Sequence, residues 1–222
     1  MSFRSSSAAG GGLASFFGDR AFARSLVRIA LPVTLQSMLR ASFSIIDQVM
    51  IGQLGSASIS GIGLGGKFAS IHNVVLSAVA AAGAILISQY LGQGSRKNAA
   101  RSYSMNLLVS LAIAALFTLV STQFAGPILG LYTQDDATRA LGQTYLQTYA
   151  WSFFPAALSS MAETLLCCME AAVFPLIASI TSLCINTALN YLLIFGHGGL
   201  PALGVQGAAV ASVAAQVVSC VL

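Results

Sequence analysis

Residues 105–120 read MNLLVSLAIAALFTLV, a run without a single charged residue. Runs of this kind decide the fold, because a helix that crosses a membrane needs about 20 consecutive, mostly apolar residues. Lipid offers no hydrogen-bond partners to the backbone, so only helices and closed barrels can span it. The run is too long and too continuously apolar for an alternating barrel strand, and it therefore predicts a transmembrane helix.

Five further runs are also long and mostly apolar, although some contain one or two charged residues. Together the six cover about residues 29–54, 66–92, 103–132, 141–169, 175–196 and 203–222. Glycine-rich or polar segments separate them, and Pro175 is well placed to begin a helix. The pattern predicts an all-α integral membrane protein built as a bundle of six transmembrane helices.

The composition supports the same class. Hydrophobic residues make up 56% of the chain and charged residues 7%, with a mean hydropathy of +0.83. Soluble domains carry about 25% charged residues, so most of this surface must face a lipid bilayer. No phosphate-binding loop, His/Cys metal spacing or nucleophile motif is present, and no basic patch is interleaved with base-reading residues. We therefore expect no enzyme, no metal site, no cofactor and no nucleic-acid partner.

The positions of the basic residues predict the topology. Seven of the ten Lys and Arg lie in the N-terminal segment or in the loop of Arg96, Lys97 and Arg101. Alternating loops place these two segments on one side of the membrane and the loop of Asp135 and Arg139 on the other. By the positive-inside rule the N-terminus is cytoplasmic. The expected organisation is a cytoplasmic tail over residues 1–28 and a transmembrane lobe over residues 29–222, in the plasma (bacterial inner) membrane.

The sixth run reaches Leu222 without a polar flank. We therefore expect the chain to be a fragment whose last helix is truncated, and its partner to be a missing C-terminal lobe or a second copy of this lobe.

Asp47 is the leading candidate for function, because an ionisable residue inside a membrane is costly. Gln36, Arg40 and Ser44 share roughly one face of the first helix with it, which makes a polar stripe. In a low-dielectric cavity a carboxyl group can exchange protons near neutral pH. The structural alternative is an ion pair between Asp47 and Arg40. Pro32, near the inner end of the same helix, favours a kink.

The fifth run carries a second stripe, formed by Ser179, Ser182, Asn186 and Asn190. Asn190 should lie at the depth of Asp47, so an Asp and two Asn side chains predict a site for a cation or proton. The alternative is ordinary interhelical hydrogen bonding. Glu163, in the fourth run, is a further candidate for a proton relay, and Ser182 and Ser212 are further candidates for the site.

Four stretches of this chain resemble the multidrug and toxic compound extrusion (MATE) family of transporters. They are Pro32 with residues 47–55 (DQVMIGQLG), residues 88–101 (SQYLGQGSRKNAAR), residues 186–196 (NTALNYLLIFG) and residues 204–212 (GVQGAAVAS). The resemblance implies one lobe of a twelve-helix, two-lobe fold around a central cavity. It also implies export of organic cations and drugs in exchange for sodium or protons.

The resemblance further implies roles for individual residues. Asp47 would take part in ion coupling, Asn186 and Asn190 would be the polar pair of helix five, and Pro32 would match a proline linked to helix bending. The chain departs from the family in two places: some members carry Asp where Asn190 stands, and residues 167–175 (CCMEAAVFP) lack the family's basic residue.

Two alternatives to drug efflux stay open. A lipid-linked precursor flippase of the same superfamily would need several basic residues to hold a diphosphate, and only Arg40 is available. A non-transporting, truncated membrane lobe is the other alternative.

Overall fold

The computed structural model describes residues 20–196 and 201–222, and no strand occurs among them. The helices are, in chain order, α1 (Arg20–Gly52), α2 (Ser56–Gly92), α3 (Arg96–Gln123), α4 (Ala125–Gly130), α5 (Asp136–Tyr149), the 3-10 turn η1 (Ala150–Ser152), α6 (Phe153–Cys168), α7 (Val173–Phe195) and α8 (Val205–Val221). The all-α membrane class predicted from the sequence is confirmed.

Four of these helices have the length and apolar composition to cross a membrane: α1 from Leu26, α2, α3 and α7. Helix α8 is apolar but shorter, and the fourth predicted span is divided between α5, η1 and α6. The exact count of six spans therefore stays a prediction. Residues 1–19 of the predicted tail lie outside the described residues, and α1 begins at Arg20.

Two predicted spans are interrupted, and proline explains both breaks. The span predicted over 103–132 ends as α3 at Gln123, and α4 begins two residues later. The next residues include Pro127, whose missing N–H cannot donate to the carbonyl of Gln123. Likewise Pro155 has no backbone N–H to donate to the carbonyl oxygen of Trp151, and the backbone forms the tighter 3-10 turn η1 just before α6.

Helix α2 begins ten residues before the predicted start at 66, because its glycines do not end it. A Cβ on Gly61 would lie 2.9 Å from the backbone nitrogen of Gly142, and one on Gly65 would lie 2.9 Å from the ring of Tyr145. These glycines let α2 and α5 approach backbone to backbone. A sequence-level rule that counts glycine as a breaker misses this packing role.

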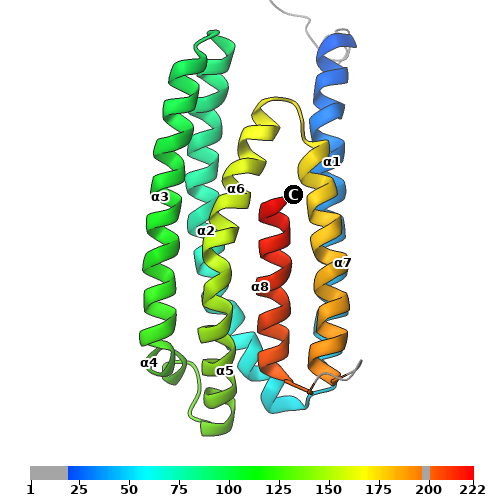
Figure 1. The fold of residues 1–222 in the computed structure, drawn as a ribbon, viewed down its shortest axis with the longest axis vertical. Coiled ribbons are helices and arrows are strands. Elements are labelled where there is room, and N and C mark those ends of the chain that lie inside the picture. The colour runs from blue at the N-terminus through cyan, green and yellow to red at the C-terminus, as the bar shows by residue number, and fades with distance from the viewer. Residues whose placement is uncertain (1–19, 197–200) are drawn as a thin grey trace, which may run out of the picture.

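The helices run roughly parallel to the long axis of the molecule (Figure 1). Helix α7 packs on α8 and α1, and α2 packs on α3 and α5. The start of α1, the α2–α3 turn and the α6–α7 turn share one end, whereas the α1–α2 and α4–α5 connections, the end of α7 and the start of α8 share the other. The N-terminal end of α1, which follows the predicted tail, and the basic α2–α3 turn thus lie at the same end of the bundle, as the alternating loops require.

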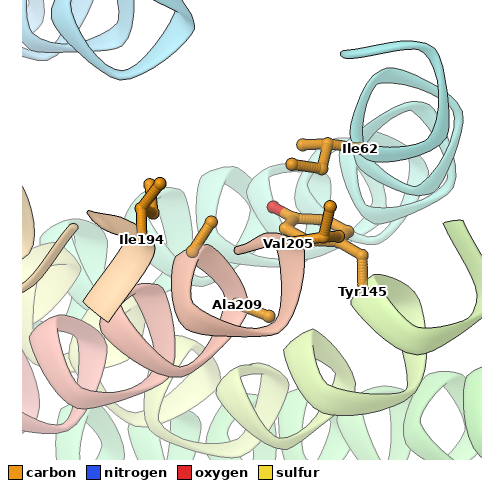
Figure 2. Close-up of a cluster of buried hydrophobic side chains, with 6 residues drawn as sticks. Ile62, Tyr145, Ile194, Val205 and Ala209 are labelled. Atoms are coloured by element: carbon orange, nitrogen blue, oxygen red, sulfur yellow. The ribbon is translucent and has the colours of Figure 1, made fainter. Parts of the chain in front are cut away.

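Two buried apolar clusters hold the bundle. One joins Ile62, Tyr145, Ile194 and Val205 to the small residues of α8 (Figure 2). The other packs Leu76 and Phe153 around alanines of α2, α3 and α6. Large apolar side chains also cover the outside, among them Leu31, Ile45, Val74, Leu108 and Phe174. An apolar exterior of this extent is what a lipid-facing protein presents.

Candidate functional site

Asp47 lies on the face of α1 that meets α7. Asn190 of α7, only 2% exposed, donates a hydrogen bond from Nδ2 to Asp47 Oδ1 at 3.0 Å. The two residues are 143 positions apart in the chain, so the tertiary fold brings them together. An ionisable side chain inside a membrane lobe is costly, so Asp47 stays the leading candidate for a functional position.

The contact continues from α7 to α8. Asn190 Nδ2 also donates to Asn186 Oδ1 at 3.2 Å, and Asn186 Nδ2 donates to Ser212 Oγ at 3.5 Å. Ser212 in turn donates to the carbonyl oxygen of Ala208 at 3.0 Å. We call Asp47, Asn186, Asn190 and Ser212 the Asp47 cluster. It links three helices through one continuous chain of polar groups.

One acceptor in the Asp47 cluster has no partner. Both groups that Asn190 Nδ2 contacts are oxygen acceptors, which defines the orientation of its amide. The amide oxygen, Asn190 Oδ1, is then buried and unpaired among the described residues. A buried acceptor with a free lone pair is able to coordinate a cation or to accept a hydrogen bond from a protonated carboxyl group.

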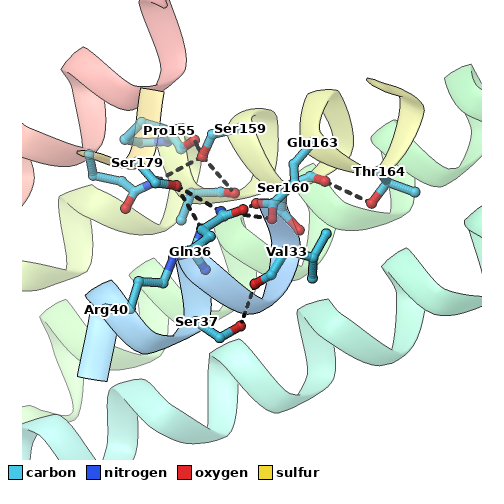
Figure 3. Close-up of polar contacts among 12 residues, drawn as sticks. Val33, Gln36, Ser37, Arg40, Pro155, Ser159, Ser160, Glu163, Thr164 and Ser179 are labelled. Atoms are coloured by element: carbon cyan, nitrogen blue, oxygen red, sulfur yellow. Dashed lines mark hydrogen bonds and ion pairs between the residues drawn. The ribbon is translucent and has the colours of Figure 1, made fainter. Parts of the chain in front are cut away.

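A second polar group joins the other half of α1 to α6 and α7 (Figure 3). Gln36 Nε2 donates to Glu163 Oε1 at 3.0 Å and to Ser179 Oγ at 2.7 Å. Arg40 Nη2 donates to Glu163 Oε2 at 3.3 Å and to Ser179 Oγ at 3.2 Å. We call these four residues the Glu163 cluster. Glu163 was a secondary candidate in the sequence, and its pairing with Arg40 was not foreseen.

The residues of the polar stripe predicted on α1 do not share one set of contacts. Gln36 and Arg40 face the Glu163 cluster and Asp47 faces α7, but Ser44 is exposed and accepts a bond from Gln48 at 3.4 Å. Ser44 lies about 60° around the helix from Asp47, the largest offset of the set, and takes no part in the contact between Asp47 and α7. The alternative pairing of Asp47 with Arg40 is replaced by the ion pair Arg40–Glu163.

The remaining candidates have structural contacts. Pro32 is buried inside α1, one turn before Gln36. Ser182 donates to the carbonyl oxygen of Ala215 at 2.7 Å and so joins α7 to α8 outside the Asp47 cluster.

A cavity of about 730 Å³ lies beside the Glu163 cluster. Its lining combines apolar and aromatic side chains with hydroxyl and amide groups from α2, α6, α7 and α8, and α1 contributes Arg40. Arg40 and Glu163 are the charged residues of this described lining. Among residues 20–196 and 201–222, no group of three His, Cys, Asp or Glu side chains is placed to hold a metal ion. An amphipathic cavity with one charge of each sign suits an amphipathic organic molecule.

A helical membrane lobe with intramembrane polar clusters and an amphipathic cavity defines the class of the protein as a polytopic membrane protein of transporter type. Residues 32–192 match the MatE family model, which is most of the chain. The chain belongs to the MatE family.

Named relatives agree with this assignment. The chain is 31% identical over 189 residues to a probable multidrug resistance protein NorM of Rhizobium meliloti, which covers 85% of this chain and 40% of the relative. It is 26% identical over 204 residues to the uncharacterized transporter YisQ of Bacillus subtilis, covering 90% of this chain and 44% of YisQ. The chain therefore spans less than half the length of these relatives.

Solved structures show the same fold. A MATE transporter of Vibrio cholerae, VcmN in the bent form, superposes with a TM-score of 0.82 at 21% identity, over 91% of this chain and 45% of that one. A MOP superfamily transporter of Pyrococcus furiosus superposes with a TM-score of 0.80 at 19% identity, over 89% and 43%.

Proposed function

We propose that this chain is the N-terminal lobe of a cation-coupled exporter of organic cations and drugs. The observation that carries the proposal is the hydrogen bond from Asn190 to Asp47, beside an unpaired buried amide oxygen. The name of the NorM relatives, probable multidrug resistance proteins, supports the substrate class. The Asp47 cluster is the proposed coupling site, and sodium or a proton is the proposed coupling ion.

The residues present fit such an ion. The carboxylate of Asp47, the amide oxygens of Asn186 and Asn190 and the hydroxyl of Ser212 are hard oxygen groups, which suit sodium. A proton on Asp47 would turn an acceptor into a donor, and Asn190 Oδ1 is a buried acceptor on the side chain that Asp47 already contacts. Either ion would remove the uncompensated charge of Asp47 from the interior of the lobe.

Neutralising Asp47 would weaken its bond to Asn190, because hydrogen bonds to ionised groups are the stronger ones. The position or bend of α1 against α7 would then change with ion occupancy. Moving one elementary charge across 100 mV is worth about 2.3 kcal/mol, enough to bias two states of the cavity by about fifty-fold.

Ethidium efflux from cells tests the proposal. Cells would express the chain and, in parallel, its complete reading frame, with and without a protonophore and with sodium varied. Asp47→Asn should abolish gradient-driven efflux in whichever form is active, whereas Ser44→Ala, on the exposed side of α1, should keep it. Wild-type efflux by Asp47→Asn, with the protein shown to be in the membrane, would refute the coupling role.

The proposed partner in transport is a C-terminal lobe or a second copy of this lobe, and the proposed location is the bacterial inner membrane with a cytoplasmic N-terminus. A mass measurement on the detergent-solubilised chain separates monomer from dimer. The flippase alternative gains no support from the fold, because Arg40, the cationic side chain it would rely on, is paired with Glu163.

A further inference from the structure

Helix α1 is tied to α6 by a single residue of α6. Among the described residues, the hydrogen bonds between these helices run from Gln36 to Glu163 Oε1 and from Arg40 to Glu163 Oε2. Both carboxylate oxygens of Glu163 thus accept hydrogen bonds from side chains of α1. No proposed step at the Asp47 cluster requires this contact, which lies in the other half of α1.

The Glu163 cluster is built into the lobe. Gln36 is 3% exposed and Ser179 is 6% exposed, so their polar atoms are shielded from solvent and hydrogen-bond to each other instead. Ser179 Oγ accepts from both Gln36 and Arg40, which holds the two donors at one point of α7. A buried donor without its acceptor is costly, so loss of Glu163 would disfavour this arrangement.

Apolar contacts do little to determine the position of α1 relative to α6. Helix α1 packs chiefly against α7, and its large apolar side chains Leu31, Leu35, Met38 and Ile45 are exposed. Its Arg40 and the Glu163 of α6 both line the cavity of about 730 Å³. The polar contacts of Glu163 therefore lie where α1 borders that cavity.

We propose that Glu163 is a positioning residue, which clasps the half of α1 around Gln36 and Arg40 onto α6 and α7 and closes the α1 side of the cavity. The clasp depends on charge because one of its two bonds is the ion pair with Arg40. The other ionisable side chains of the cavity lining are the phenol of Tyr149 and the thiol of Cys220, and the thiol of Cys167 lies one turn further along α6 from Glu163. Residues of α2 and α7 that line the cavity are uncharged. Only the link from cavity closure to transport rests on the proposed function.

Electron–electron distance measurements on spin labels test the clasp. The four native cysteines would be replaced by alanine, and labels placed at Val27 of α1 and Met169 after α6, both more than half exposed. A second pair at Ile85 of α2 and Leu108 of α3 reports whether the bundle is intact. The protein would be measured in lipid nanodiscs, with Glu163→Leu, Glu163→Gln and the charge swap Arg40→Glu/Glu163→Arg.

Glu163→Leu should lengthen and broaden the α1–α6 distance while the α2–α3 distance is unchanged. Glu163→Gln keeps an acceptor for Gln36 but loses the ion pair, so the α1–α6 distance in this variant should lie between the distances in Glu163→Leu and in the wild type. The charge swap should move the distance back toward wild type. An unchanged α1–α6 distance in Glu163→Leu would overturn the clasp, and a swap that restores nothing would overturn its dependence on charge.

If Glu163→Leu disturbs the α2–α3 distance as well, Glu163→Gln carries the test under the same criteria. The distances do not require transport. A lengthened distance together with absent efflux in the wild type would sustain the clasp and refute the proposed function, so the two failures are separate results.

Discussion

At the scale of single residues, Asn190 has the most constrained role. Its amide nitrogen serves both Asp47 and Asn186, and its side chain is almost completely buried. Because Asp47 has no other hydrogen-bond donor among the described residues, Asn190 alone supports the carboxylate. The state of α1 should therefore respond to changes at Asn190 as strongly as to changes at Asp47.

Asn190→Ala should lower the free energy of unfolding by about 0.6–2 kcal/mol, the range found for interhelical hydrogen bonds in membranes. It should also weaken the dependence of efflux on the coupling ion. Denaturation in mixed micelles measures the first effect and efflux at varied sodium and pH the second. Ser44→Ala is the matched control, since Ser44 is exposed on the same helix as Asp47. Equal unfolding curves for Asn190→Ala and the wild type would contradict the role of Asn190.

At the scale of elements, helix starts and helix contacts are determined by specific local chemistry. Helix α5 begins after Asp135, whose carboxylate accepts from the hydroxyl and the backbone N–H of Thr138. This is an N-cap, which satisfies one of the unpaired donors of the first turn. Helix α5 then meets α2 at Gly61 and Gly142, where the two backbones come into contact.

Asp135→Ala should destabilise the start of α5, whereas Asp136→Ala, in the same turn but without a capping bond, should have a smaller effect. Hydrogen bonds from the Thr138 hydroxyl and then from its backbone N–H lower the pKa of Asp135. The folded state thus favours the ionised form, so the cap contributes fully at neutral pH and is lost as pH falls through that lowered pKa. Amide hydrogen exchange of residues 136–140 against pH measures it. Exchange in Asp135→Ala that matches the wild type at neutral pH would rule out the cap.

Gly61→Ala should be destabilising relative to Gly63→Ala by about 1–3 kcal/mol, the usual cost of overpacking. Both changes gain the same helix propensity, so their difference isolates the clash. A Cβ on Gly61 meets backbone atoms at 2.9 Å, while one on Gly63 meets nothing within 4 Å. Thermal unfolding of the two variants in one detergent gives the comparison. Equal stability would mean that α2 and α5 can separate without cost.

At the scale of the whole molecule, the two ends of the bundle differ in charge. The end that holds the start of α1 and the α2–α3 turn carries Arg96, Lys97 and Arg101, all exposed. The opposite end holds the turn before α5, with Asp135 and Asp136. Such an asymmetry orients a membrane protein with its basic end in the cytoplasm.

Cysteine labelling should reveal that orientation. In a cysteine-free background, Gln134→Cys should react with a membrane-impermeant maleimide added to intact cells, and Gln93→Cys should react only after the cells are opened. Both side chains are exposed in turns at opposite ends of the bundle. The reverse pattern would show that the N-terminus faces outward.

Sequence alone determined the class of this protein and the residues worth testing. Long apolar runs need helices in lipid whatever their neighbours are, and charges within such runs are conspicuous, so Asp47, Asn186, Asn190 and Glu163 could be singled out. Even the prolines that divide two spans were visible, although their effect was not predicted.

Only the tertiary structure decided which polar groups meet. Periodicity gives an angle around one helix, but the identity of the helix that faces it depends on packing between segments more than 100 residues apart. For this reason the sequence did not show that Arg40 pairs with Glu163, or that Ser44 takes no part in the contact between Asp47 and α7. The division of α1 between an Asp47 cluster and a Glu163 cluster is a property of how α6, α7 and α8 pack around it, which no single segment encodes.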